Sequence, residues 1–209
     1  MHQSDEFFWK RCEQKYYPYF HEPSKVIEFG SRDINGSIRD YFSCSSYIGI
    51  DWRGHNSAVN FVCLAHEAPF VPETFDTVAS ASMLEHDPYW KKSLAKMVEV
   101  LKPDGLLVIS WGSALNTPHH EDMAPDGKFH GLPAERVIKH LEKLGMYIHE
   151  FQYERSILEC ERANNLEIDI RLTRNKQAGR GTVVLVAFKD KIYAKGGQDI
   201  DPFLKEDGI

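Results

Sequence analysis

The sequence lacks three features that would each point to a broad class of function. No apolar run approaches the roughly 20 residues that a membrane-spanning helix needs, and the N-terminal residues MHQSDEFFWKRCEQ lack the apolar stretch of a secretory signal. No basic stretch offsets the formal net charge of -6, which argues against a nucleic-acid partner. These absences point away from membranes, secretion and nucleic acids.

Cysteine is scarce, and the glycine pattern of a dinucleotide-binding loop is missing. The four cysteines, Cys12, Cys44, Cys63 and Cys160, show no CxxC spacing, so we expect buried thiols rather than zinc ligands or disulfides. Such thiols suit the reducing cytoplasm, where we expect the protein to act. A GxGxxG motif is absent because Arg32 stands where glycine is needed, which weakens an NAD-binding interpretation.

Short apolar runs alternate with helical patterns along the chain. At 209 residues, 42% of them hydrophobic, the chain has room for one sizeable core and a single domain. Strand-length runs occur at 26–29, 47–50, 59–63, 77–80 and 106–110. Apolar residues at helical spacing predict helices over 89–101, stopped by Lys102-Pro-Asp-Gly, and over 133–144. This alternation predicts a parallel sheet with helices on both faces.

The remaining segments divide the chain into three parts. Residues 1–24 form an aromatic, helical segment that either packs on the domain or covers its site as a lid. Residues 25–190 form the main domain, and residues 191–209 form a polar tail. Within the main domain, residues 111–131 are rich in Pro, His, Asp and Gly and read as a loop too long to be a mere connection.

The first predicted strand runs into a loop that favours a nucleotide-like ligand. Gly30 and Gly36 follow the strand, and we expect a helix to begin near Ser37. Glycine lets a ligand approach the backbone, and a helix N-terminus offers free N–H groups. The second strand ends in Asp51, whose carboxylate can accept hydrogen bonds from both hydroxyls of a ribose.

Five motifs in order resemble the class I S-adenosylmethionine (SAM) dependent methyltransferases, and most closely the methyltransferase type 11 group. They are Glu28-Phe-Gly-Ser, Ile48-Gly-Ile-Asp, Ala65-His-Glu-Ala-Pro-Phe, Phe75-Asp-Thr-Val with Met83-Leu-Glu-His, and Lys102-Pro-Asp-Gly-Leu-Leu-Val-Ile-Ser. The resemblance implies a Rossmann-like α/β fold with a seven-stranded, mostly parallel sheet of order 3-2-1-4-5-7-6. Residues 147–153 and 182–188 would be its last two strands.

The resemblance also implies a set of SAM-binding residues. Carried over by position, Glu28, Gly30 and Ser31 border the methionine part, Asp51 binds the ribose, Trp52 stacks on the adenine, Leu64, Ala65 and His66 meet the adenine edge, and Ala81 and Met83 line the methionine end. Arg32 lies in the same loop, where its guanidinium can hold a carboxylate of the ligand or the acceptor. The expected cofactor is therefore SAM.

The methyl acceptor is expected to be a small molecule that is methylated on oxygen or nitrogen, but its identity and the oligomeric state do not follow from the sequence. Candidates for removing a proton are His86, His119 and His120. The alternative roles are packing or capping for His86, and exposed loop positions for His119 and His120. A metal site at 119–122 with His130 is conceivable, but the spacing matches no known zinc motif, so none is expected.

Two other functions remain open at this point. A non-catalytic SAM-binding or protein-interaction module would keep the fold, and the departures from the family pattern at Arg32 and Leu64 favour it. A nicotinamide-dependent oxidoreductase would share Asp51 but needs the glycine pattern that is absent.

Overall fold

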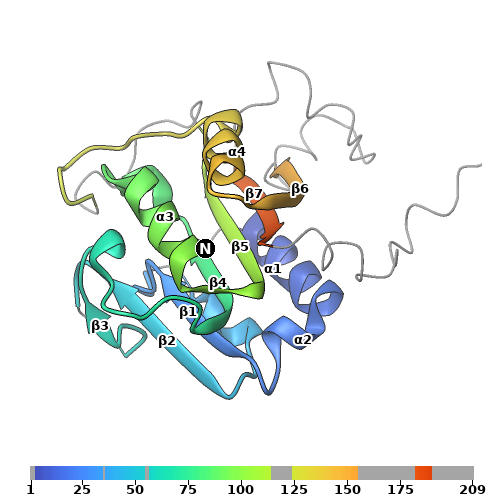
Figure 1. Ribbon diagram of the computed structural model, residues 1–209. Helices are drawn as coiled ribbons and strands as arrows, with labels where there is room; N and C mark the ends of the chain where they lie inside the picture. Colours follow the sequence, from blue (N-terminus) through green and yellow to red (C-terminus); the bar gives the residue numbers. More distant parts are fainter. Residues whose placement is uncertain (1–2, 35, 55–56, 114–123, 155–181, 190–209) are drawn as a thin grey trace, which may run out of the picture.

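The strands of the protein form one sheet in the order β3-β2-β1-β4-β5-β7-β6. The computed structural model describes residues 3–34, 36–54, 57–113, 124–154 and 182–189. Its strands are β1 (Lys25–Phe29), β2 (Ser46–Asp51), β3 (Phe61–Val62), β4 (Phe75–Ala81), β5 (Leu101–Gly112), β6 (Tyr147–Glu154) and β7 (Thr182–Phe188). The first five are parallel (Figure 1), whereas β7 runs antiparallel to both β5 and β6. The predicted Rossmann-like fold and strand order are confirmed.

The inner strands are apolar along almost their whole length because both faces of the sheet are covered. In β1, Val26 to Phe29 are all buried, and in β7 every residue is buried. β7 owes this burial to its place between β5 and β6, although it comes last in the chain. A continuous β-branched run at 182–188 is therefore the sequence of an inner strand.

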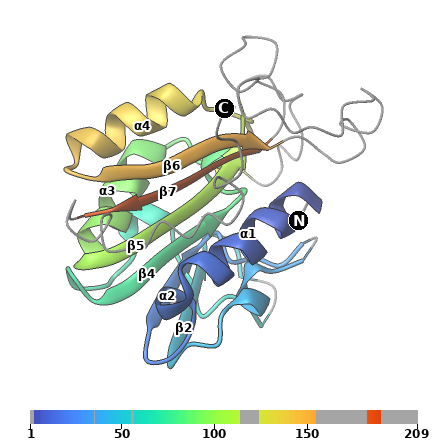
Figure 2. The same cartoon turned by 90° about the vertical axis from the view of Figure 1, so that its right-hand side faces the viewer.

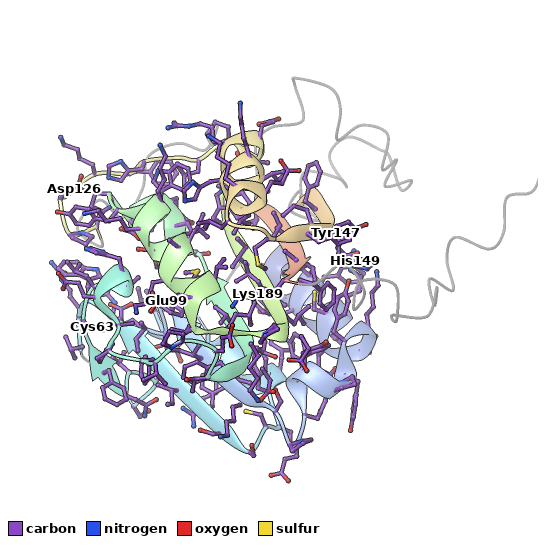
Figure 3. The ribbon with its side chains drawn as sticks, viewed as in Figure 1. Cys63, Glu99, Asp126, Tyr147, His149 and Lys189 are labelled. Atoms are coloured by element: carbon purple, nitrogen blue, oxygen red, sulfur yellow. The ribbon has the colours of Figure 1, made fainter. Side chains whose placement is uncertain are left out.

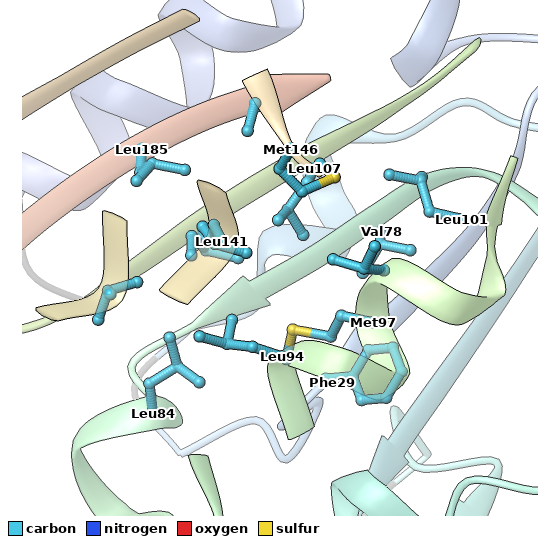
Figure 4. Close-up of a cluster of buried hydrophobic side chains, with 14 of the residues drawn as sticks. Phe29, Val78, Leu84, Leu94, Met97, Leu101, Leu107, Leu141, Met146 and Leu185 are labelled. Carbon is cyan, nitrogen blue, oxygen red and sulfur yellow. The ribbon is translucent and has the colours of Figure 1, made fainter. Parts of the chain in front are cut away.

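One face of the sheet is covered by α3 (Trp90–Val100) and α4 (Ala134–Lys143). Figure 4 shows the buried side chains of this layer, which belong to a single core cluster; they include Leu94, Met97, Leu141, Val78, Leu107 and Leu185. Fully burying an aliphatic side chain of this kind stabilises the fold by roughly 1.5–3 kcal/mol. This layer is thus a main source of the stability of the domain.

The opposite face is covered by α1 (Gln3–Lys15) and the short α2 (Tyr17–Phe20) (Figure 2). Phe8, Trp9 and Phe20 are fully buried in a second cluster together with Val108 of β5 and Val186 of β7. The aromatic residues of α1 and α2 therefore act in packing on the sheet. They do not border the cleft described below.

The largest difference from the sequence-based expectation lies after Gly36. Instead of an α-helix, Ser37 caps the four-residue 3-10 helix η1 (Ile38–Tyr41), and Phe42 is already extended. The Phe42 ring stacks on Phe20 at 4.4 Å, and the Ser43 N–H donates to the Phe20 carbonyl at 2.9 Å. A helix does begin near Ser37 as predicted, but it is short and of the 3-10 type, because these contacts and the poor helix formers of this stretch end it early.

The other predicted elements differ only at their bounds. The expected helices over 89–101 and 133–144 are α3 and α4. The strand expected at 106–110 begins earlier, at Leu101, so Lys102 to Gly105 already belong to β5. Among the helices in the described ranges, none combines the length and apolar character that crossing a bilayer requires.

The cysteines are less uniformly buried than expected. Cys12 is buried, whereas Cys44 and Cys63 are only half-buried and carry free thiols. Cys160 lies outside the described residues, as does the polar tail.

Candidate functional site

A cleft lies at the carboxyl ends of β1, β2, β3 and β4, where the strand order changes direction between β1 and β4. Open α/β sheets bind ligands at such a switch point. The cleft is lined by Glu28, Gly30–Asp33, Ile34, Gly36–Ile38, Ile50–Trp52, Cys63–Ala65, Ala81–Met83, His86, Asp87 and Pro125. Figure 3 shows Cys63 on the same side of the molecule as Asp126, and opposite Tyr147 and His149.

The loop after β1 holds Gly30 against the end of β4. Gly30 has a φ of +82°, and a β-carbon at this position would lie 2.5 Å from Cβ of Met83. The N–H groups of Gly30 and Ser31 both donate to the Ile50 carbonyl, at 2.8 and 2.9 Å. Only glycine combines this backbone conformation with such close packing, so the loop passes tightly between β2 and β4.

Glu28 is a buried acid in the floor of the cleft. Its Oε2 accepts a hydrogen bond from the Tyr47 hydroxyl at 2.6 Å. Burial raises the pKa of the Glu28 carboxyl to about 8, and the hydrogen bond from Tyr47 opposes this rise only in part. Glu28 is therefore largely neutral at pH 7, and a cation placed beside it would favour its ionised form.

The end of β2 presents a carboxylate beside an aromatic ring. Oδ1 of Asp51 accepts a hydrogen bond from the Arg53 N–H at 2.9 Å, and Asp51 and Trp52 both line the cleft. Burial raises the pKa of Asp51, while Arg53 and Arg32 act to lower it. The Arg53 guanidinium lies 4.3 Å from the centre of the Trp52 ring, which is close enough for a cation–π contact.

Of the three residues after β3 that were predicted to meet the adenine edge, two line the cleft and one does not. Leu64 and Ala65 line the cleft together with Cys63, and Ala65 starts the 3-10 helix η2 (Ala65–Glu67). His66 does not line it, because its ring packs against Tyr89 with 4.7 Å between the ring centres. His66 thus borders the neighbouring helix rather than the cleft.

The end of β4 brings polar groups to the cleft. Ala81, Ser82, Met83, His86 and Asp87 line it, and the 3-10 helix η3 (Leu84–His86) lies among them. Ser82 has a φ of 51°, the left-handed region that non-glycine residues seldom adopt. Backbone strain of this kind gathers at functional sites.

Two residues of this turn, His86 and Asp87, are buried and ionisable. His86 is 9% exposed, and its ring lies 5.7 Å from that of Phe129. Asp87 is 6% exposed. Burial raises the pKa of the Asp87 carboxyl, and Ser93, the Tyr89 N–H, His66 and His130 act in the opposite direction.

The loop after β5 is tied to η3. The His130 N–H donates to the Glu85 carbonyl at 2.7 Å, and the Gly112 N–H donates to Glu85 Oε1 at 2.9 Å. The Trp111 indole N–H donates to the Leu132 carbonyl at 2.9 Å. Glu85 therefore joins β4, β5 and the returning loop, and Pro125 of this loop reaches the cleft.

The sequence-based site and the observed cleft agree at most positions. Of the expected cofactor residues, Glu28, Gly30, Ser31, Arg32, Asp51, Trp52, Leu64, Ala65, Ala81 and Met83 line the cleft, and so does His86. His119 and His120 lie outside the described residues, as do Glu121 and Asp122. In the described ranges, no group of three or more His, Cys, Asp or Glu side chains is arranged to hold a metal ion.

Ten lining residues were not among the predicted SAM-binding or catalytic residues: Asp33, Ile34, Gly36, Ser37, Ile38, Ile50, Cys63, Ser82, Asp87 and Pro125. Asp87 directly follows the His86 that was singled out, so its place beside a candidate was a usable signal. No sequence signal indicated the left-handed backbone at Ser82, because serine does not mark that conformation as glycine does.

Comparison with protein families supports the same resemblance. A family model described as a methyltransferase domain matches residues 40–109. The match begins after the Gly30 loop and includes the ends of β2, β3 and β4. No curated protein matches the chain significantly.

Solved structures share the fold. A SAM-dependent methyltransferase from Archaeoglobus fulgidus is 17% identical, with a TM-score of 0.57 over 87% of this chain and 93% of its own. Phosphoethanolamine N-methyltransferase 2 from Haemonchus contortus, in complex with SAM, is 16% identical, with a TM-score of 0.61 over 88% of this chain and 53% of its own. The 1,6-didemethyltoxoflavin-N1-methyltransferase of Burkholderia thailandensis, with bound substrate and S-adenosylhomocysteine, is 14% identical, with a TM-score of 0.58 over 88% and 77%. The resemblance to class I SAM-dependent methyltransferases is thus confirmed.

Proposed function

We propose that this chain binds SAM in the cleft and transfers its methyl group to the oxygen or nitrogen of a small molecule. One observation carries the proposal: the Gly30 loop, Asp51 and the Leu64–Ala65 turn come from three strand ends and border one cleft at the switch point of the sheet. A nucleoside with a charged tail needs these three kinds of contact together.

Each charged part of SAM has a matching group in the cleft. Glu28 would hold the ammonium of the methionine part, and Arg32 would hold its carboxylate. Asp51 would accept hydrogen bonds from the ribose hydroxyls. Gly30 and Ser31 would lie along the methionine chain, and the absence of a β-carbon at Gly30 lets the loop pack against Met83 there.

The uncharged parts of SAM match the apolar residues of the cleft. Trp52 would stack on the adenine, and Leu64 and Ala65 would meet its edge. Ala81 and Met83, at the end of β4, would line the methionine end near the reacting carbon. His66 is the weakest member of the proposed set, because its ring packs on Tyr89 outside the cleft.

The residues of the chain chiefly bind and orient the reactants. Bound SAM supplies an electrophilic methyl carbon, so in-line placement of the acceptor provides much of the rate. The end of β4 and the loop with Pro125 border the space left for that acceptor. His86 lies there and remains a candidate for proton transfer, as do His119 and His120 of the same loop.

The acceptor class is proposed from two relatives with a shared fold. The enzymes named for 1,6-didemethyltoxoflavin and phosphoethanolamine both act on small molecules. For this chain we propose a small acceptor in the same way, acting in the cytoplasm. We also propose that residues 1–24 and 25–190 form one folded unit, with 191–209 as a tail.

A second function is favoured by one feature of the fold. The short η1 replaces the helix whose N-terminus would face the ligand, and Arg32 and Leu64 depart from the family pattern. A non-catalytic SAM-binding or protein-interaction module would tolerate these changes. Such a protein would bind SAM but leave its methyl group in place.

Calorimetric titration with SAM, S-adenosylhomocysteine (SAH) and NAD separates the functions. Saturable binding of SAM and SAH without binding of NAD is expected for a methyltransferase, and binding of NAD alone would indicate an oxidoreductase. Asp51→Ala should weaken SAH binding by about 1–3 kcal/mol through lost charge-assisted hydrogen bonds. An unchanged SAH affinity in this variant would remove Asp51 from the site.

A further inference from the structure

Asp87 is a buried carboxylate at the acceptor side of the cleft. It is 6% exposed and lines the cleft where the chain leaves β4 and η3. Its Oδ1 accepts a hydrogen bond from the Tyr89 N–H at 2.7 Å, at the start of α3. Its Oδ2 is buried and has no partner within hydrogen-bond distance among the described residues, although the Ser93 side chain lies close enough to lower the pKa of the carboxyl.

The hydrogen bond to the start of α3 uses only one of the two carboxylate oxygens of Asp87. One carboxylate oxygen is enough to accept the Tyr89 N–H, and an asparagine would do this equally well. Burying a second, unpaired carboxylate oxygen costs free energy. Burial is the largest influence and raises the pKa of Asp87, while the side chain of Ser93, together with His66 and His130, favours the charged form and offsets the rise in part.

No part of SAM, as placed above, needs Asp87 as a binding partner. Glu28, Arg32 and Asp51 account for the ammonium, the carboxylate and the ribose of SAM. Asp87 comes from the end of β4, beyond Met83 at the methionine end, where the acceptor must lie. Oδ2 is therefore the carboxylate oxygen left to meet the acceptor, once the side chains that cover it in this structure make room.

The charge of the cleft narrows the class of acceptor. Among the described residues that line it, Glu28, Asp33, Asp51 and Asp87 are acids, and Arg32 is the one arginine or lysine. Even with Glu28 largely neutral, Asp33, Asp51 and Asp87 outnumber Arg32, and such a lining repels anions and attracts cations. An acceptor that carries its own carboxylate or phosphate beside the reacting atom is disfavoured, whereas an amine is attracted.

We propose, on the basis of the methyltransferase function above, that Asp87 binds the reacting nitrogen of a small primary or secondary amine and accepts its proton. The ammonium form of the acceptor pairs with Oδ2 and gives one proton to the carboxylate. The nitrogen lone pair then forms the N–C bond to the methyl carbon while the C–S bond breaks, with its electron pair going to sulfur. The products are the N-methylated ammonium and SAH, and the proton on Asp87 returns to water.

Burial makes Asp87 suited to this step. Because burial raises the pKa of its carboxyl, Asp87 is a better proton acceptor than an exposed aspartate. His86 precedes it in the chain and contacts the Phe129 ring, and Ser93, His66 and His130 also lie near it, so a small amine would meet the carboxylate beside polar and aromatic groups. This arrangement selects for the amine rather than for a large charged substrate.

Matched probes test the acceptor class. SAH-loaded protein is titrated with propylamine, benzylamine and histamine, and with the alcohol and the carboxylate of the same skeletons; methylation by SAM is followed as SAH formation. We expect at least one amine to bind and to be methylated, and its alcohol and carboxylate counterparts to do neither. Binding of SAH without binding of any amine, or turnover of the alcohols or carboxylates in preference, would overturn the inference and leave the proposed function standing. Failure to bind SAH would reject the proposed function itself.

Asp87→Asn tests the residue. Asparagine can still accept the Tyr89 N–H, so the variant should fold and bind SAH as the wild type does. Its kcat/KM for the amine should fall about 100-fold or more, as for loss of a proton acceptor, with weaker amine binding to the SAH complex. Asp104→Asn, at the exposed start of β5, is the matched control and should change neither. Wild-type amine binding and turnover in Asp87→Asn would show that Asp87 serves α3 alone.

Discussion

Glu28 should couple the binding of a ligand cation to the release of a proton. Its carboxyl is largely protonated at pH 7, because burial raises its pKa to about 8. A ligand ammonium beside it would hold it ionised, so binding of SAH near pH 7 should release up to about one proton. Calorimetry in two buffers of different ionisation enthalpy measures this number directly. Glu28→Gln should bind SAH without the release, and equal release in both proteins would assign the proton to another group.

Glu28 should also make the stability of the ligand-free protein depend on pH. The folded pKa of Glu28 lies above its ordinary value of 4.5, so the folded state holds more protons than the unfolded chain between about pH 4.5 and 8. The contribution of Glu28 is present below that window and is lost as pH rises through it. Glu28→Gln should therefore lose less stability than the wild type between pH 5 and 8 in urea unfolding. A parallel decline in the two proteins would contradict this.

At the residue scale, the sequence was most informative where chemistry leaves one choice of side chain. The ribose contact of Asp51 stays a prediction. The places of Asp51 and Gly30 in the cleft could be predicted, because Asp51 ends β2 and the loop needs a residue without a β-carbon. The unpartnered Oδ2 of Asp87 and the left-handed Ser82 could not, because they depend on how η3 turns after β4. Packing also moved His66 away from the cleft, onto Tyr89.

Among the elements, η3 holds the loop after β5 in place. The Glu85 side chain accepts from the Gly112 N–H, and its carbonyl accepts from the His130 N–H. Glu85→Ala removes the first bond and leaves a buried donor, so it should lower the free energy of unfolding by about 1–3 kcal/mol. Urea unfolding measures the loss. Glu142→Ala, at an exposed position of α4, is the control. An equal effect of both changes would show that the Glu85 hydrogen bond to β5 does not stabilise the fold.

Element types were predictable where the hydrophobic pattern repeats, and they were not where long-range contacts decide. The strands and α3 follow from periodicity, because alternate faces or helical stripes must be buried. η1 does not follow, since its end depends on Phe42 stacking on Phe20, a residue in a separate element. The strand order needed the family resemblance, because periodicity cannot place β7 between β5 and β6.

At the scale of the whole molecule, both helical layers rest on the same sheet, so we expect one cooperative unit. Trp9 of α1 is fully buried against the face opposite to α3 and α4. Trp9→Ala should lower the free energy of unfolding by about 3–5 kcal/mol, which is a large part of the 5–15 kcal/mol typical of a domain. Urea unfolding followed by circular dichroism and by fluorescence should give coincident transitions in the wild type. Phe7→Ala, at a 59% exposed position, should have little effect, and separate transitions would show that α1 is an independent appendage.

The position of β7 has a consequence for how the protein is made. The ribosome synthesises this inner strand after β1 to β6. Until β7 has been made, it cannot pair with β5 and β6 and so join them in the sheet. At a translation rate of roughly 5–20 residues per second, the apolar edge of β5, from Leu106 to Ile109, waits for several seconds without its neighbour. Newly made chains should therefore depend on chaperones that shield such an edge, and a premature stop before residue 182 should yield an aggregating product rather than a smaller enzyme.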